Sequence, residues 1–99
     1  PLYIFASCGK CAHVHGEHDA NGAAVTLWDA GEGKHTRWRI ERAGPRGEGY
    51  FNIVSCYSGR AWCNAGGNTE GVGIVTWDQT GGDDSIQVYF EPAEKQGYW

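Results

Sequence analysis

The chain has 99 residues, the length of one small domain, and carries a formal net charge of −4 at pH 7. This charge argues against nucleic-acid binding, which requires a basic surface, and no apolar run is long enough to insert into a membrane. Sixteen glycines separate short runs of β-branched and aromatic residues, which is typical of an all-β chain with many turns.

The first half of the chain predicts four strands joined by one hairpin turn and two loops. The first strand covers Ile4–Cys8 and ends at the turn Gly9-Lys10, after which a second strand returns. The third strand is the β-branched run that closes at Trp28-Asp29. A glycine-rich polar loop then leads to the fourth strand, Thr36–Ile40, where apolar and polar residues alternate as in a half-buried strand.

The second half of the chain repeats this order about 49 residues later. Trp77-Asp78 closes a second β-branched run, 49 positions after Trp28-Asp29. Gly59-Arg60 corresponds to the earlier hairpin turn, and Ile86–Phe90 corresponds to the earlier fourth strand. Self-similarity at a fixed spacing predicts one structural unit that is used at least twice.

We therefore expect a β-trefoil-like fold, an all-β architecture in which four-stranded units are arranged with three-fold symmetry. The single predicted domain covers 1–99, with repeat one at 1–47, repeat two at 48–96, and 97–99 as the start of a third repeat or a tail. A missing third unit would leave strand edges open, and open edges favour pairing with another chain. Either a longer natural chain or a homo-oligomer would complete these edges.

The hairpin of the first repeat resembles that of a known lectin family. Gly9–Val14 and Asn21–Trp28 resemble the Gly-Lys-Cys-Leu-Asp-Val and Asn-Gly-Thr-x-Val-Gln-Leu-Trp motifs of the ricin B-type (R-type) β-trefoil lectins. Gly9–Glu17 is also similar to the Gly-Lys-x-x-His-Pro-Tyr-Gly-Gly signature of the mussel β-trefoil lectins that bind galactose and N-acetylgalactosamine. The resemblance implies a non-enzymatic lectin that binds the glycans of glycoproteins or glycolipids and needs no cofactor.

The resemblance also implies a candidate carbohydrate site in each repeat. The first site would combine a hairpin histidine, the Trp-Asp pair and a histidine from the following loop, whereas the second repeat has Cys63 in place of the hairpin histidine. The Asn-Gln pair of the ricin-type site is absent near 34–36. The candidate residues are His13, Gly16, Trp28, Asp29 and His35 in the first repeat, and Gly66, Trp77, Asp78 and Asp83 in the second. We expect the first repeat to hold the better site, because it has both the histidine and the aspartate.

A tryptophan beside an aspartate suits the chemistry of a pyranose. The aromatic ring can stack on the apolar C–H face of the sugar, and the carboxylate can accept hydrogen bonds from two hydroxyls at once. Such a site is shallow and wet, so each contact contributes little net free energy. We expect a dissociation constant on the order of 0.1–1 mM per site, with useful binding arising from several sites acting together.

The same residues also have structural interpretations. Trp28 and Trp77 could lie in the core, and because their positions correspond, both should be buried or both should face a ligand. Asp29 and Asp78 could instead form turns by accepting bonds from local backbone N–H groups. In that case the protein is a structural or protein-interaction trefoil that binds no sugar. Three further aromatic residues are expected in the core: Trp38, Tyr89 and Phe90.

Four cysteines leave several possibilities open: Cys8, Cys11, Cys56 and Cys63. An even number suits a disulfide-bonded protein in a secreted or extracellular location. In the ricin-type pattern the partner of Cys11 would follow the Leu-Trp run, where Ala30 stands here, so the family's disulfide cannot be carried over. Cys8-x-x-Cys11 with its neighbouring histidines amounts to half of a zinc site, and we expect no metal there.

The carboxylates of the second repeat do not predict catalysis. Asp83 and Asp84 are adjacent on a glycine-rich loop and cannot flank a glycosidic bond as the acids of a glycosidase do. Together with Asp78 they could bind calcium, as in a βγ-crystallin-type domain, which is the alternative fold of similar length. Ser85–Val88 lacks the paired hydroxyl residues of that family's calcium motif.

Overall fold

The computed structural model describes residues 1–29, 33–42, 49–66, 70–79 and 86–91. These residues form six β-strands and two short 3-10 turns: β1 (Cys11–Val14), η1 (His15–Glu17), β2 (Ala23–Trp28), η2 (Lys34–Thr36), β3 (Trp38–Arg42), β4 (Phe51–Ser55), β5 (Ala61–Asn64) and β6 (Ile74–Trp77). Neither turn in this described part has the length or the hydrophobicity of a helix that spans a membrane.

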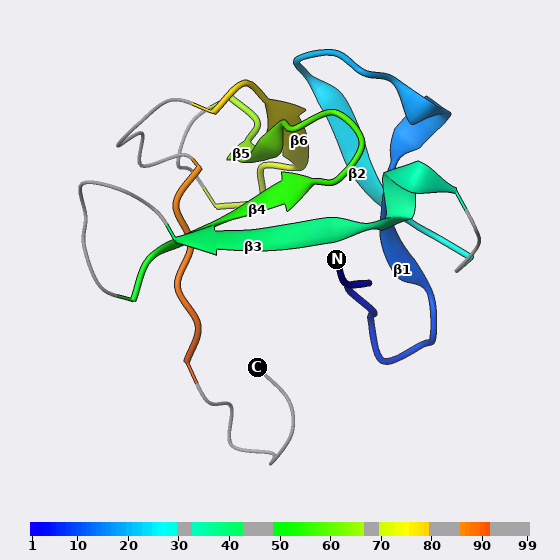
Figure 1. Cartoon of the computed structure of the whole chain (residues 1–99), viewed down its shortest axis with the longest axis horizontal. Coiled ribbons are helices and arrows are strands. Elements are labelled where there is room, and N and C mark those ends of the chain that lie inside the picture. The colour runs from blue at the N-terminus through cyan, green and yellow to red at the C-terminus, as the bar shows by residue number, and fades with distance from the viewer. Residues whose placement is uncertain (30–32, 43–48, 67–69, 80–85, 92–99) are drawn as a thin grey trace.

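The six strands form one antiparallel sheet in the order β1-β2-β6-β5-β4-β3, and the sheet is curled (Figure 1). The N-terminal segment connects its two outer strands, because Leu2 bridges to Trp38 of β3 and Phe5 bridges to Cys11 of β1. The edges that the sequence predicts to be open are therefore partly covered. The predicted strand Ile4–Cys8 is wrong, because backbone pairing in this segment is limited to the bridge at Phe5.

The barrel pairings of the two repeats correspond. Leu2 bridges to Trp38 in the first repeat, and Phe51, 49 residues after Leu2, bridges to Val88 in the second. The strand predicted over Ile86–Phe90 is reduced to this bridge. The internal repeat read from the sequence is thus also a repeat of backbone pairing.

The two hairpins share one register as well. Cys11 lies opposite Trp28 in the β1–β2 hairpin, and Ala61 lies opposite Trp77 in the β5–β6 hairpin. The hairpins pair with each other through β2 and β6, where Ala23 lies opposite Thr76. Each Trp-Asp pair therefore stands at the end of the second strand of its hairpin.

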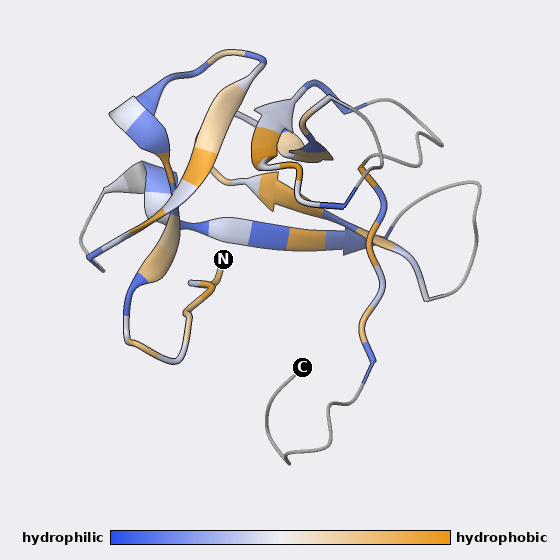
Figure 2. Cartoon of the chain, turned by 180° about the vertical axis from the view of Figure 1, so that it is seen from behind, coloured by the Kyte–Doolittle hydropathy of each residue, from blue (hydrophilic) through white to orange (hydrophobic). Residues whose placement is uncertain are grey.

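Trp38 lies at the centre of the core and is fully buried, as the sequence predicts. Its indole N–H donates a hydrogen bond to the carbonyl oxygen of Ala12 over 3.1 Å, and its ring meets that of Trp62 edge to face at 5.8 Å. Val14 and Ile53 complete the same buried cluster. The hydropathy colours alternate along β3 (Figure 2), as expected for a strand with one face toward a core.

Tyr89 and Phe90 do not belong to this core, so their assignment from the sequence is wrong. Tyr89 is 59% exposed and Phe90 is 46% exposed. Ile86 is buried two residues before the paired Val88, and alternation along the extended chain turns Tyr89 outward. The ring of Phe90 lies against that of Phe51, with a centroid distance of 5.7 Å, at the surface of the molecule.

The exposure of the two Trp-Asp tryptophans excludes their interpretation as core. Trp28 is 58% exposed and Trp77 is 43% exposed, so both indoles lie at the surface. The environments correspond, as their positions in the repeat require. Both rings are therefore free to meet a ligand.

The four cysteines are free thiols in this structure, so a disulfide among them is not supported. Cys11 is buried in β1 and behaves as a small apolar residue of the interior. Among the described residues, no group of three or more His, Cys, Asp or Glu side chains is placed to hold a metal ion. The zinc interpretation of Cys8 and Cys11 therefore gains no support.

Candidate functional site

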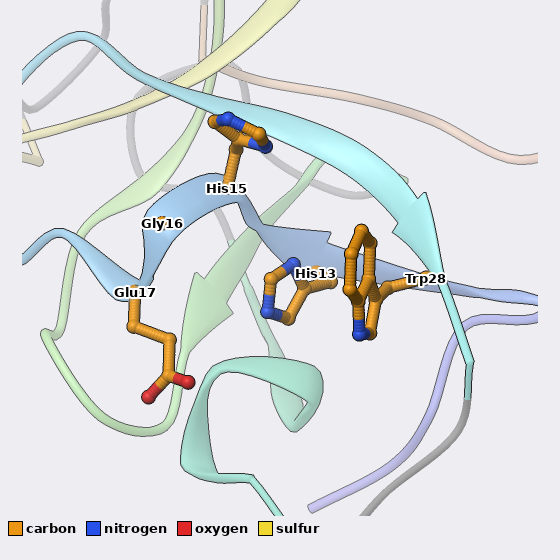
Figure 3. A pocket seen from close by; sticks show the side chains of 5 residues that line it. All are labelled: His13, His15, Gly16, Glu17 and Trp28. Atoms are coloured by element: carbon orange, nitrogen blue, oxygen red, sulfur yellow. The ribbon is translucent and has the colours of Figure 1, made fainter.

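A pocket with a volume of about 310 Å³ opens where β1, η1 and β2 meet. Its lining combines aromatic, imidazole and carboxylate groups, from His13, His15, Gly16, Glu17 and Trp28. Figure 3 shows His13 between Trp28 on one side and Glu17 on the other. Three of the five lining residues (His13, Gly16 and Trp28) are among those that the sequence predicts.

The register of the β1–β2 hairpin brings His13 and Trp28 together. His13 lies opposite Thr26, which places Trp28 two residues further along β2 on the same face of the sheet. The two rings stack with a centroid distance of 5.7 Å and an interplanar angle of 24°. More than half of the indole surface remains open to solvent, so a second ring can stack there.

The η1 turn forms the opposite rim because two successive residues adopt left-handed backbone. Gly16 has φ = 68°, and a Cβ atom built at this position would lie 2.6 Å from Nε2 of His18. Glu17 follows with φ = 56° and is the one non-glycine residue with positive φ among those described. Glu17 lines the pocket from this turn, and its left-handed backbone carries the conformational cost that a β-carbon incurs there.

His13 is neutral at pH 7. Partial burial lowers its pKa, and the neighbouring His35 and His15 act in the same direction, while Glu17 opposes them. Its Nδ1 atom is buried without a hydrogen-bond partner among the described residues. A neutral imidazole provides one donor and one acceptor, and because Nδ1 is buried, Nε2 is the ring nitrogen left to meet a ligand.

His35 does not line the pocket. It lies on η2, it is only 4% exposed, and its ring packs against Tyr57 with a centroid distance of 4.3 Å. η2 itself is closed by Thr36, whose hydroxyl donates to the carbonyl oxygen of Gly33 over 2.6 Å. His35 thus influences the site through its electrostatic effect on His13.

Asp29 points to the hairpin turn instead of to the pocket. Its carboxylate accepts a 2.6 Å hydrogen bond from Nζ of Lys10, and this ion pair lowers the pKa of Asp29 and raises that of Lys10. The pair lies on the surface, where such interactions contribute little to stability. Asp29 is not among the side chains that line the pocket beside Trp28.

The second repeat uses its Trp-Asp carboxylate in the same way. Nε of Arg60 lies 3.5 Å from the Asp78 carboxylate, and Arg60 also pairs with Asp19. Asn21 joins the two repeats, because it donates to the Asp78 carboxylate over 3.1 Å and accepts a bond from the Asp78 backbone N–H over 2.8 Å. Asp78 therefore holds the loop of the first repeat against the second.

The remaining predicted residues of the second repeat differ in part from their counterparts in the first. Gly66 shares the left-handed backbone of Gly16, with φ = 72°. Cys63 occupies the position of His13, and its thiol bonds weakly to the carbonyl oxygen of Asn64. Asp83 lies outside the described residues.

His15 and Glu17 line the pocket although they are absent from the residues predicted for the site. Glu17 occupies the second glycine position of the Gly-Lys-x-x-His-Pro-Tyr-Gly-Gly signature, and this departure from the pattern was the available signal. Glu17 has left-handed backbone, which is unfavourable for glutamate. A sequence pattern therefore gives no indication of this conformation.

Comparison with known proteins gives one family. The family model "Ricin-type beta-trefoil lectin domain-like" matches residues 4–77, which confirms the resemblance to R-type lectins carried by the hairpin motifs. No curated protein sequence matches the chain. The β-trefoil-like fold expected from the sequence is thereby confirmed, and the βγ-crystallin-type alternative is wrong.

Two solved structures share this fold. The designed 3-fold symmetric protein ThreeFoil matches with a TM-score of 0.70 and 25% identity over 80% of this chain and 54% of its own. A Polyporus squamosus lectin, bound to the human-type influenza-binding epitope Neu5Aca2-6Galb1-4GlcNAc, matches with a TM-score of 0.69 and 19% identity over 85% of this chain and 28% of its own. The chain thus spans about half of the first structure and under a third of the second.

Proposed function

Because this chain belongs to the ricin-type beta-trefoil lectin-like family, we propose that it binds carbohydrate, without catalysis, in the pocket between β1, η1 and β2. The observation that carries the proposal is the exposed indole of Trp28 beside the neutral imidazole of His13. A pyranose can stack its C–H face on the indole while its hydroxyls bond His13 and Glu17.

The sugar that we propose is a terminal galactose or N-acetylgalactosamine. The support is the similarity of Gly9–Glu17 to the galactose-specific signature, of which His13 and Gly16 both line the pocket. The axial 4-hydroxyl of galactose leaves one face of the ring apolar, and this face suits stacking on Trp28. Glycans of glycoproteins and glycolipids carry such termini outside the cell, and a secreted or extracellular location is part of the same proposal.

The first repeat supplies the principal site in this proposal, and binding is weak per site. The second repeat keeps an exposed Trp77 but has Cys63 where the first has His13. A dissociation constant on the order of 0.1–1 mM is expected for one open site, so strong attachment to a glycan surface requires several sites. Self-association of the chain would supply them.

We infer such self-association from exposed apolar surface. A second pocket, of about 300 Å³, is lined almost entirely by apolar side chains from both repeats, among them Phe5, Leu27, Trp62 and Ile74. Phe5 and Leu27 are more than half exposed. Since the two hairpins already pair through β2 and β6, a hairpin of a second copy is the occupant that fits this surface.

Trp28→Ala and Trp77→Ala test the proposed sugar site as a matched pair, because both indoles are exposed at corresponding positions. NMR titration with galactose and N-acetylgalactosamine should give saturable shifts in the wild type. Loss of aromatic stacking, about 1.5 kcal/mol, should weaken binding by about tenfold in Trp28→Ala, while Trp77→Ala should stay within about twofold. A wild type that binds neither sugar, or a Trp28→Ala variant that binds as well as the wild type, would contradict the proposal.

A further inference from the structure

The pocket has a single carboxylate in its lining. Its five lining residues include two imidazoles and one carboxylate, and no lysine or arginine. Glu17 is therefore the one acidic side chain among the residues that line the pocket. The cation of the neighbouring hairpin turn, Lys10, is paired with Asp29.

The backbone at Glu17 indicates that its side chain has a role in the site. Left-handed backbone favours glycine and tolerates asparagine, and a glutamate there is strained. Residues held in such backbone cluster at ligand sites. Glu17 lines the same pocket as the exposed ring of Trp28, on the other side of His13 (Figure 3).

We propose that Glu17 is a specificity-determining residue that makes this pocket select neutral sugars and reject sugars that carry a carboxylate, such as uronic acids and sialic acid. The inference rests on the proposed sugar-binding function and names its substrate class. A carboxylate accepts hydrogen bonds from two sugar hydroxyls at once, and it repels a second carboxylate a few ångströms away.

Methyl galactoside and methyl galacturonide test this charge effect, because they have the same ring stereochemistry and differ by one carboxylate at C6. We would measure both affinities by NMR titration at pH 8 and low salt. The wild type should bind the neutral glycoside at least about tenfold more tightly than the acidic one. Glu17→Gln should reduce this ratio to about threefold or less, mainly by gaining affinity for the acidic sugar.

Two control variants isolate the effect of this carboxylate. Glu17→Asp keeps the charge and should retain most of the discrimination. Glu70→Gln changes net charge equally at an exposed position of the second repeat and should leave the ratio unchanged. Removing Glu17 takes away an interaction that raises the pKa of His13, so His13 stays neutral at pH 8 in the variant.

The outcomes separate this inference from the proposed function. Saturable binding of the neutral glycoside with the same ratio in wild type and Glu17→Gln would overturn the role of Glu17 alone. A wild type that binds neither glycoside would overturn both. Unchanged melting temperatures would show that Glu17→Gln acts on recognition and not on folding.

Discussion

The surroundings of His13 determine the pKa of its imidazole. Burial is the largest cause that lowers the pKa of His13, and the imidazoles of His35 on η2 and His15 on η1 lower it further. Glu17 opposes these effects and raises the pKa. Only the neutral ring has an acceptor nitrogen, and protonation converts it into a donor. A sugar hydroxyl that donates to His13 is therefore bound only while the ring is neutral.

Sugar affinity should accordingly depend on pH in a defined direction. The folded protein holds the pKa of His13 below 6.5. The affinity for the sugar should therefore be highest at pH 7 to 8 and should fall as the pH drops through that lowered pKa. NMR titrations with galactose between pH 8 and 5 would measure it. His15→Gln should retain the pH dependence, and His13→Asn should remove it. An affinity of the wild type that does not change over this range would contradict the role of His13.

The Trp-Asp aspartates show why the site could be predicted from the sequence only in part. The motif correctly indicated that Trp28 lies near His13, because hairpin register follows from local sequence pattern. It gave no indication that Asp29 pairs with Lys10 across the same hairpin, or that Asp78 is held by Asn21 of the other repeat. The Lys10–Asp29 pair follows from the hairpin register, in which Cys11 lies opposite Trp28. The Asn21–Asp78 contact depends on the relative positions of distant segments, which no short motif encodes.

The η1 turn is the element on which the pocket depends. Gly16 and Gly66 occupy corresponding positions in the two repeats, and both have left-handed backbone. The two differ in their surroundings, because a Cβ at position 16 would meet the ring of His18, whereas a Cβ at position 66 would have no atom of the described residues within 4 Å. Conformational strain and crowding can therefore be separated experimentally.

Alanine substitutions at three glycines should give graded losses of stability. Gly66→Ala should lower the free energy of unfolding by about 1 kcal/mol, because alanine is strained in left-handed backbone. Gly16→Ala should cost at least as much, since the His18 ring must also move. Gly73→Ala, where φ is not left-handed and the space is open, should change stability little. Urea denaturation would measure all three, and equal losses at all three positions would contradict this ordering.

The strands of the fold were also predictable to different degrees. The strands that end in Trp28 and Trp77 form as expected, because β-branched runs with exposed and buried faces specify them. The predicted strands at Ile4–Cys8 and Ile86–Phe90 are reduced to single bridges. Phe5 pairs locally with Cys11 and Val88 pairs with the distant Phe51, so in both segments the apolar pattern overestimates the regularity of the strand.

Across the whole molecule, the two repeats are held together by polar contacts on one side and present apolar surface on another. Asn21, Asp78 and Arg60 connect the repeats. The apolar pocket beside Phe5 and Leu27 is shared between them and is open to solvent. Exposed apolar surface of this kind is typical of protein–protein contacts.

Sedimentation velocity would test the proposed contact between copies. The wild type should form dimers or larger species at about 100 μM, and Leu27→Glu should shift it to monomer, because a charge cannot be buried in an apolar contact without a partner. Ile40→Glu, a similar change at an exposed site on β3 outside the pocket, should leave the association unchanged. A monomeric wild type at this concentration would rule out the contact.

Because Trp38 is buried, its fluorescence can be distinguished from that of the exposed tryptophans. Its indole is shielded from water and bonded to the carbonyl oxygen of Ala12, whereas Trp28 and Trp77 are in contact with water. An aqueous quencher such as iodide can reach the two surface rings but not the core ring. Among these three tryptophans, iodide should therefore quench Trp28 and Trp77 more strongly than Trp38, whose emission follows the integrity of the core.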